Sequence, residues 1–387
     1  NILLEEDETL TNKGKLTLGL TDDNTSLITI NGGTAENDGT IVVKSTQKVA
    51  SNIDGKFTSA GTIQISDKTI DELKEEKFEA SNLFHGKYTF TGMLKDKDGK
   101  GVLQTDDVII GGGDYNSDEI NNTGKENNGE VNLGDNLALV GGEKTIDVGS
   151  VNVYNDITVK NDTSGNGVTI ENTSINIDGE KHITIGETGT KADLVISSGE
   201  VNGKEGETAV EFANKDSSLT LDGTNFTGNI GTENGTNGTV NITDSTINGD
   251  VTAGSVVTGE EDLWSQLFGN ARLRTALFAA ASNEVKTTTY EGDVTANDRL
   301  GVINENVVYN GKVTFNGADN DGINIGATSG NKATATFNGD VKSNNIKLVG
   351  DATAYYASDI TLTNKDSSNG TAINGGTNIF EVADNGA

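Results

Sequence analysis

The sequence predicts an all-β protein that folds as a parallel β-helix, a coil of short strands in which each strand pairs with the equivalent strand of the next turn. Short runs with Val, Ile or Leu at alternate positions recur along almost the entire chain of 387 residues. Turn-forming Gly pairs separate these runs, and the chain has 50 Gly but no Pro. Alternation with a period of two is typical of a strand that buries one face.

The clearest runs lie between residues 140 and 255, where their starts recur about every seven to twelve residues. Thr, Asn or Asp separates the apolar residues within each run. These runs begin at Lys144, Asp156, Val168, Ser174, His182, Leu194, Leu219, Thr239 and Ser245, and similar runs begin at Lys15, Leu27, Gly39, Gly61, Lys312, Asp321, Ala333, Asn345, Asp359 and Asn378. Low hydrophobic content with high net charge would favour disorder, but the regular spacing favours strands in a solenoid.

Tight-turn pairs lie between the runs, and Gly in such a pair is expected to supply a positive φ. They are Asp178-Gly179, Asn202-Gly203, Asp222-Gly223, Asn234-Gly235, Asn237-Gly238 and Asn248-Gly249. Each pair also favours a hairpin, so an antiparallel meander is the alternative. Runs of three to five residues are short for independent hairpins, but they suit a coil with roughly twenty residues per turn and about 4.8 Å between turns.

Composition excludes several classes of function. The chain has no Cys, so it has no disulfide, no thiolate metal site and no cysteine nucleophile. Its formal charge of −31 repels nucleic acid, which we do not expect as a partner. Only His85 and His182 offer imidazole groups, and we expect both to be structural. No apolar run approaches the ~20 residues of a membrane helix.

Three segments interrupt the repeat, and we expect them to be insertions in a single β-helix that spans residues 1–387. The first covers about residues 69–108 and opens with Thr69-Ile-Asp-Glu72, the spacing of a capping box, which predicts a helix as far as Ala80. A hairpin of residues 87–91 and 102–104 should follow it. The second, about residues 111–130, is rich in Gly, Asn and Asp and predicts a surface loop.

The third insertion, residues 260–284, predicts a short amphipathic helix. Its apolar residues recur at helical spacing, and three acidic residues stand at its start, where the helix dipole favours them. The helix could cover apolar surface on the wall of the coil, or it could expose a surface to a partner. Aromatic and Arg side chains dominate interface hot spots. The candidate partner-binding residues are therefore Trp264, Phe268, Arg272, Arg274 and Phe278.

The sequence predicts no catalytic residue, no cofactor and no metal site. Close carboxylates occur at Asp106-Asp107, at Asp96 with Asp98 and at Asp319 with Asp321, but with 59 acidic residues such pairs arise by chance and are expected on a solvated wall. The segments 96–99 and 317–322 alternate oxygen ligands without the bidentate Glu of a calcium loop. No Gly-x-Ser-x-Gly elbow is present. We therefore do not expect an enzyme, although a carbohydrate-active β-helix remains an alternative.

Runs such as residues 238–251 (GTVNITDSTINGDV) and 332–341 (KATATFNGDV) resemble the passenger domains of bacterial autotransporters, the type V secretion adhesins. Related secreted haemagglutinin-like β-helices are similar as well. The resemblance extends over most of the chain and rests on the recurring pattern of short β-branched runs rather than on an invariant motif. It implies a right-handed β-helix that is displayed on the bacterial cell surface, at the outer membrane, or secreted. Contact with a membrane is expected only through a C-terminal barrel, which this segment lacks.

The expected function is that of an adhesin segment, non-enzymatic, which binds a surface protein or glycan of host cells or of other bacteria. Extended solenoid surfaces suit polyvalent binding because they offer many weak contacts. A self-associating structural or biofilm module is the main alternative from another class.

Overall fold

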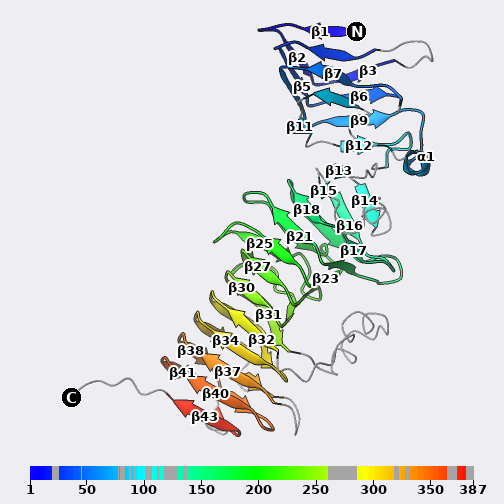
Figure 1. Ribbon diagram of the computed structural model, residues 1–387. Helices are drawn as coiled ribbons and strands as arrows, with labels where there is room; N and C mark the ends of the chain where they lie inside the picture. The colour runs from blue at the N-terminus through cyan, green and yellow to red at the C-terminus, as the bar shows by residue number, and fades with distance from the viewer. Residues whose placement is uncertain are drawn as a thin grey trace. The chain divides into compact units, whose positions relative to one another are not determined.

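The computed structural model describes residues 1–19, 26–44, 46–76, 78, 83–86, 89–90, 93–100, 107–110, 113–116, 130–133, 137–259, 286–317, 322–326, 332–363 and 373–380. The chain forms two compact units, Asn1–Ile183 and Thr184–Ala387. Each unit is a right-handed parallel β-helix, and Figure 1 shows the strands of each stacked as successive turns. The predicted fold class is confirmed, and the antiparallel meander is excluded for the described strand pairs, which run parallel.

Unit 1 contains three ladders over its first turns. The first holds β1 (Ile2–Leu4), β4 (Ile28–Ile30), β7 (Ala50–Ile53) and β10 (Phe84–Gly86), and the second holds β2 (Thr9–Asn12), β5 (Thr34–Asn37), β8 (Lys56–Ser59) and β11 (Thr89–Phe90). The third holds β3 (Lys15–Thr17), β6 (Thr40–Val43), β9 (Thr62–Ile65), β12 (Met93–Lys95), β13 (Asp107–Ile110), β15 (Glu130–Leu133), β18 (Ser150–Val153) and β21 (Ser174–Ile177). The later turns add β14 (Gly113–Asn116), β16 (Leu137–Val140), β17 (Ile146–Asp147), β19 (Ile157–Lys160) and β20 (Val168–Glu171).

Unit 2 also has three ladders. The boundary between the two units, after Ile183, falls within β22 (Ile183–Ile185). Its first ladder holds β24 (Glu200–Asn202), β27 (Asn225–Thr227), β30 (Thr246–Asn248), β32 (Thr287–Tyr290), β34 (Asn306–Tyr309), β37 (Thr334–Phe337), β40 (Thr353–Tyr356) and β43 (Thr377–Phe380). The second holds β25 (Thr208–Phe212), β28 (Asn229–Ile230), β31 (Val251–Thr258), β33 (Val294–Val302), β35 (Val313–Phe315), β38 (Val341–Ser343) and β41 (Ile360–Leu362). The third holds β23 (Asp193–Ser197), β26 (Ser218–Asp222), β29 (Thr239–Thr243), the second halves of β31 and β33, β36 (Ile323–Ile325), β39 (Ile346–Leu348) and β42 (Ile373–Asn374).

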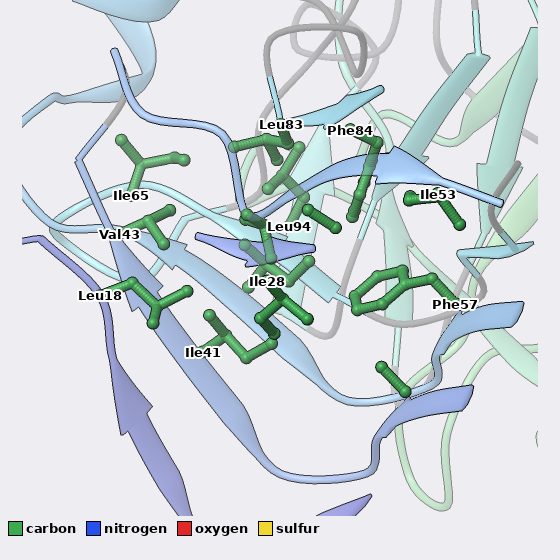
Figure 2. Packing of buried hydrophobic residues seen from close by; sticks show 14 of the residues in the cluster. Leu18, Ile28, Ile41, Val43, Ile53, Phe57, Ile65, Leu83, Phe84 and Leu94 are labelled. Atoms are coloured by element: carbon green, nitrogen blue, oxygen red, sulfur yellow. The ribbon is translucent and has the colours of Figure 1, made fainter. Parts of the chain in front are cut away.

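The core of each unit is a column of apolar side chains from alternate strand positions. In β4, Ile28 and Ile30 are buried while Thr29 between them is half-buried. Figure 2 shows labelled side chains from several strands of unit 1 that converge in its interior. The rings of Phe57 and Phe84 lie 5.3 Å apart there. The period-two pattern therefore identifies the buried positions, because successive side chains of a strand point to opposite faces.

Stacked side chains of one type run along the coil. In unit 1, Asn12 Nδ2 donates to Asn37 Oδ1 at 2.7 Å, and Asn37 Nδ2 donates to Ser59 Oγ at 2.9 Å. Asn176 and Asn152 make the same kind of bond. Such hydrogen-bonded rows of polar side chains join successive turns, as stacked Asn side chains do in other parallel stacks.

An aromatic column stabilises unit 2. It consists of Tyr290, Tyr309, Phe337, Tyr356 and Phe380, which are aligned in the first ladder. Neighbouring rings lie 5.0 to 5.4 Å apart, with interplanar angles of 15° or less. The parallel register imposes this stacking because it places the same strand position of each turn directly over the last.

At most of the predicted turn pairs, glycine does not supply the positive φ that we expect there, and at several positions it is needed for close packing between turns. Of the six predicted turn glycines only Gly179 and Gly223 have a positive φ. At Gly249 a Cβ atom would lie 2.0 Å from the carbonyl oxygen of Gly228, and at Gly292 a Cβ atom would lie 2.4 Å from that of Gly249. Stacked corners therefore require glycine because successive turns approach too closely for a side chain.

The segment that begins at Thr69 contains one short helix, α1 (Ile70–Glu75), which ends earlier than predicted. The capping box is confirmed, because Thr69 N donates to Glu72 Oε2 at 2.7 Å and Glu72 N donates to Thr69 Oγ1 at 3.3 Å. The hairpin is wrong in its first strand, since β11 pairs in parallel with β8. In this region β10, β11 and β12 continue the three ladders of unit 1. The surface loop expected over about residues 111–130 is wrong at 113–116, because these residues form β14, which pairs in parallel with β16. Residues 102–104 and 117–129 lie outside the described residues.

We expect Gly292→Ala to lower the free energy of unfolding by about 1–3 kcal/mol, because the new methyl group must displace the carbonyl of Gly249. Gly301→Ala is the matched control, since its Cβ would meet no atom of the coil closer than 3.8 Å. Urea unfolding followed by circular dichroism measures both. Equal losses for the two variants would contradict the requirement for glycine at the corner.

Tyr355 and Tyr356 offer a second matched pair. Tyr356 is 2% exposed and stacks between two rings, whereas its neighbour Tyr355 is 41% exposed on the outer wall. Tyr356→Ala should cost about 3–5 kcal/mol of stability, as for other buried aromatics. Tyr355→Ala should cost less than about 1 kcal/mol. A similar loss for both would show that the column contributes little.

Candidate functional site

The predicted partner-binding residues Trp264, Phe268, Arg272, Arg274 and Phe278 lie outside the described residues, as does all of 260–285. The structure instead describes the corner at which this segment leaves and rejoins the coil. Gly259 follows β31, and Lys286 precedes β32. The candidate site is therefore defined by its base, which belongs to unit 2.

The register shows how much chain the corner normally needs. Thr258 pairs with Val302 of the next turn, and Thr287 pairs with Asn306. The next turn thus covers the same path with only Ile303, Asn304 and Glu305, where this turn has residues 259–286. This turn therefore has about 25 more residues at the corner than the next turn has.

A row of buried polar side chains supports the corner from within. Ser245 Oγ accepts a hydrogen bond from Thr224 N at 3.0 Å, and Thr288 Oγ1 accepts one from Ser245 N at 3.3 Å. Thr288 Oγ1 in turn donates to Glu305 Oε1. The row therefore joins four successive turns and ends in a carboxyl group.

Glu305 is the unusual member of this row because it is only 1% exposed. Its Oε1 atom also accepts a hydrogen bond from Asp244 N at 2.9 Å, whereas its Oε2 atom is buried and has no hydrogen-bond partner in the described part of the chain. Burial raises the pKa of Glu305 to about 7, against the opposing effect of the two hydrogen bonds. The nearby charge of Asp244 raises the pKa further, and Lys286 lowers it.

Lys286 extends from the end of the insertion across the outer side of the corner. Its Nζ atom lies 3.5 Å from Asp222 Oδ1, and both side chains are about one quarter exposed or less. An ion pair of this exposure contributes at most about 1 kcal/mol. It does, however, connect the return point of residues 260–285 to the strand β26.

The other titratable candidates have structural surroundings. Asp96 is buried, and its oxygens accept hydrogen bonds from the N atoms of Ile70, Asp98 and Lys100 at 2.8 to 2.9 Å. This carboxylate therefore ties the start of α1 to its loop. Within the described ranges, no three His, Asp or Glu side chains gather closely enough to hold a metal ion. The described residues also include no helix of the length and apolarity needed to cross a membrane.

The two histidines do not form a catalytic group with a nucleophile among the described contacts. His85 is exposed at β10, and His182 Nδ1 lies 3.4 Å from Asp156 Oδ1 on the outer side of unit 1. Glu305 is the residue that sequence reasoning missed. No sequence signal marks it: Glu305 precedes Asn306, which pairs with Thr287 and Thr334, so its equivalents in the adjacent turns are Lys286 and Ala333.

Comparisons with protein-family models, with curated proteins and with solved structures find no match to this chain.

We expect Glu305→Gln to change how stability depends on pH. The pKa of Glu305 in the folded chain, about 7, lies above its ordinary value of 4.5, so its protonation favours the folded state. This contribution is complete below about pH 4.5 and is lost as the pH rises through about 7. The Gln variant should therefore match the unmodified protein at pH 4.5 and exceed its unfolding free energy by up to about 3 kcal/mol at pH 8.

Urea unfolding at a series of pH values measures this difference. Glu200→Gln is the control, because Glu200 is exposed on β24. A difference between Glu305→Gln and the unmodified protein that does not change with pH would contradict the assignment of a buried, proton-binding carboxyl group.

Proposed function

We propose that this chain is a bacterial adhesin segment of the passenger type, displayed on the cell surface or secreted, that binds host cells or other bacteria without catalysing a reaction. The observation that supports the proposal is the extra sequence of residues 260–285 at one corner of the parallel β-helix of unit 2. This segment contains the only Trp of the chain and two of its three Arg residues.

A coil of this kind provides a stable support for a binding segment. Its turns are joined by continuous ladders, aromatic stacking and amide rows, so a segment anchored at a corner is held at both ends by rigid strands. Insertions in repeat proteins project from the regular faces and often form the binding face. Trp, Phe and Arg are the residue types that contribute most binding energy at interfaces.

The charge of the chain favours particular partners. With a formal charge of −31, the outer walls repel acidic polymers and attract basic or neutral surfaces. Trp264, Arg272 and Arg274 would then supply aromatic and cationic contacts within an acidic surrounding. A neutral glycan or a basic patch on a surface protein fits this combination.

Self-association is a second candidate, and one observation favours it. Tyr355 and Ile379 are neighbours in register on the outer face of the first ladder of unit 2, and both are more than 40% exposed. Exposed apolar side chains in a row are unusual on a wall whose other positions are mostly Thr and Asn. A second copy of this chain could cover them.

The register defines a clean deletion to test the main proposal. Replacing residues 260–285 by a single Asn leaves Gly259-Asn-Lys286, which has the length of Ile303-Asn304-Glu305 in the next turn. This variant should keep the β-sheet circular dichroism and lose at least about tenfold in affinity for bacterial or host cells. Substitution of the five candidate residues by Ala should have a similar effect.

The control is Tyr355→Ser with Ile379→Ser, which leaves residues 260–285 intact. Cell binding that is unchanged by the deletion would refute the assigned segment. Loss of concentration-dependent sedimentation in the control variant alone would favour self-association instead.

A further inference from the structure

Glu305 joins three turns of unit 2 at the corner from which residues 260–285 leave. Its Oε1 atom accepts one hydrogen bond from Thr288, on the adjacent turn, and one from Asp244 N, on the turn beyond. The two donors lie 17 and 61 residues away in sequence. Asp244 has a left-handed backbone with φ of 49°, and Asn304, next to Glu305, has φ of 51°. The carboxyl group thus holds the left-handed Asp244 to the turn that contains the left-handed Asn304.

The charges around Glu305 compensate for its ionisation only weakly, because the effect of Lys286 is opposed by that of Asp244. Asp244 is exposed and has the same sign, and Lys286 is already 3.5 Å from Asp222. On the inner side lie the hydroxyl groups of Tyr290 and Tyr309, which burial keeps neutral by raising the pKa of each. Thr258 Oγ1 and Tyr290 OH share a hydrogen bond of 2.7 Å with each other. An ionised Glu305 would therefore be a buried charge with one oxygen unsolvated.

We propose that Glu305 is a proton-controlled latch for this corner: its neutral carboxyl group holds the turns of Asp244, Thr288 and Glu305 together, and loss of the proton loosens them. A buried carboxylate needs water or a cation, and water can reach Oε2 only if the corner opens. Opening would move Lys286, which is the point at which residues 260–285 return to the coil. The regulatory consequence rests on the proposed function, because it assumes that this segment binds the partner.

Hydrogen exchange of the unmodified full chain tests the latch without any partner. Exchange is measured by mass spectrometry from pH 5.5 to 8.5 and corrected for the intrinsic dependence of exchange on pH. Peptides that cover residues 240–259 and 286–310 should show an opening equilibrium that rises roughly 30-fold across this range, because the open form releases the proton more readily. Peptides that cover β40 should show no comparable rise.

The Glu305→Gln variant should abolish the rise, and Glu200→Gln should retain it. A corrected exchange rate at the corner that does not change with pH in the unmodified protein would overturn the proposal, and so would the same rise in the Gln variant. If the Gln variant fails to fold, carboxyl resonances of ¹³C-glutamate in the unmodified protein decide the point. A glutamate that titrates near pH 7 supports the latch, and titration of all glutamates below pH 5.5 contradicts it.

The latch and the proposed function can fail separately. Cell binding of the unmodified protein and of Glu305→Gln is compared at pH 5.5 and pH 8. If exchange at the corner depends on pH but binding by the two proteins does not, the latch stands and the assignment of residues 260–285 as the binding segment fails. If binding requires residues 260–285 but exchange at the corner is constant, the latch fails and the adhesin proposal stands.

Discussion

The constraint on which this structure depends is the in-register parallel pairing of each strand with the equivalent strand of the next turn. Since register places the same position of every turn in one row, a side chain that fits once must fit at each neighbouring turn. The buried Ile and Val rows, the aromatic column from Tyr290 to Phe380 and the amide row of Asn12, Asn37 and Ser59 follow from this rule. The residue type at one position is therefore coupled to the residue types at the same position of the neighbouring turns.

Features set by local physics could be predicted from the sequence. Alternating Val and Ile marked the buried face of strands such as β4, because side-chain direction alternates in any strand, and the spacing of Thr69 and Glu72 marked the start of α1. The reason for glycine in the Asn-Gly pairs could not be determined from the sequence, because two different reasons predict the same residue. A positive φ and a close approach between turns both demand glycine, and only the stacked positions of Gly249 and Gly292 show that the second reason applies there.

The candidate site was predictable only in part. The insertion at residues 260–284 was evident because it breaks the repeat, whereas the roles of Trp264 and Arg272 stay predictions. Glu305 could not be singled out among 59 acidic residues, since its burial depends on Asp244 and Thr288, which are distant in sequence. A charged side chain in a buried row costs stability. A buried carboxyl group at the end of the hydrogen-bonded series Thr224, Ser245 and Thr288 therefore indicates a role beyond packing.

The glycine-lined corners have a consequence for how such a chain can change over generations. A single residue gained or lost inside a strand would turn the following core side chains of that strand outward, unless a bulge absorbs it as one does between Ala253 and Ser255. Extra sequence at a corner, as between Thr258 and Thr287, leaves the rows aligned. Lineages of this protein should therefore differ by whole turns and by corner segments, so that new surface can be acquired while the inner architecture is inherited unaltered.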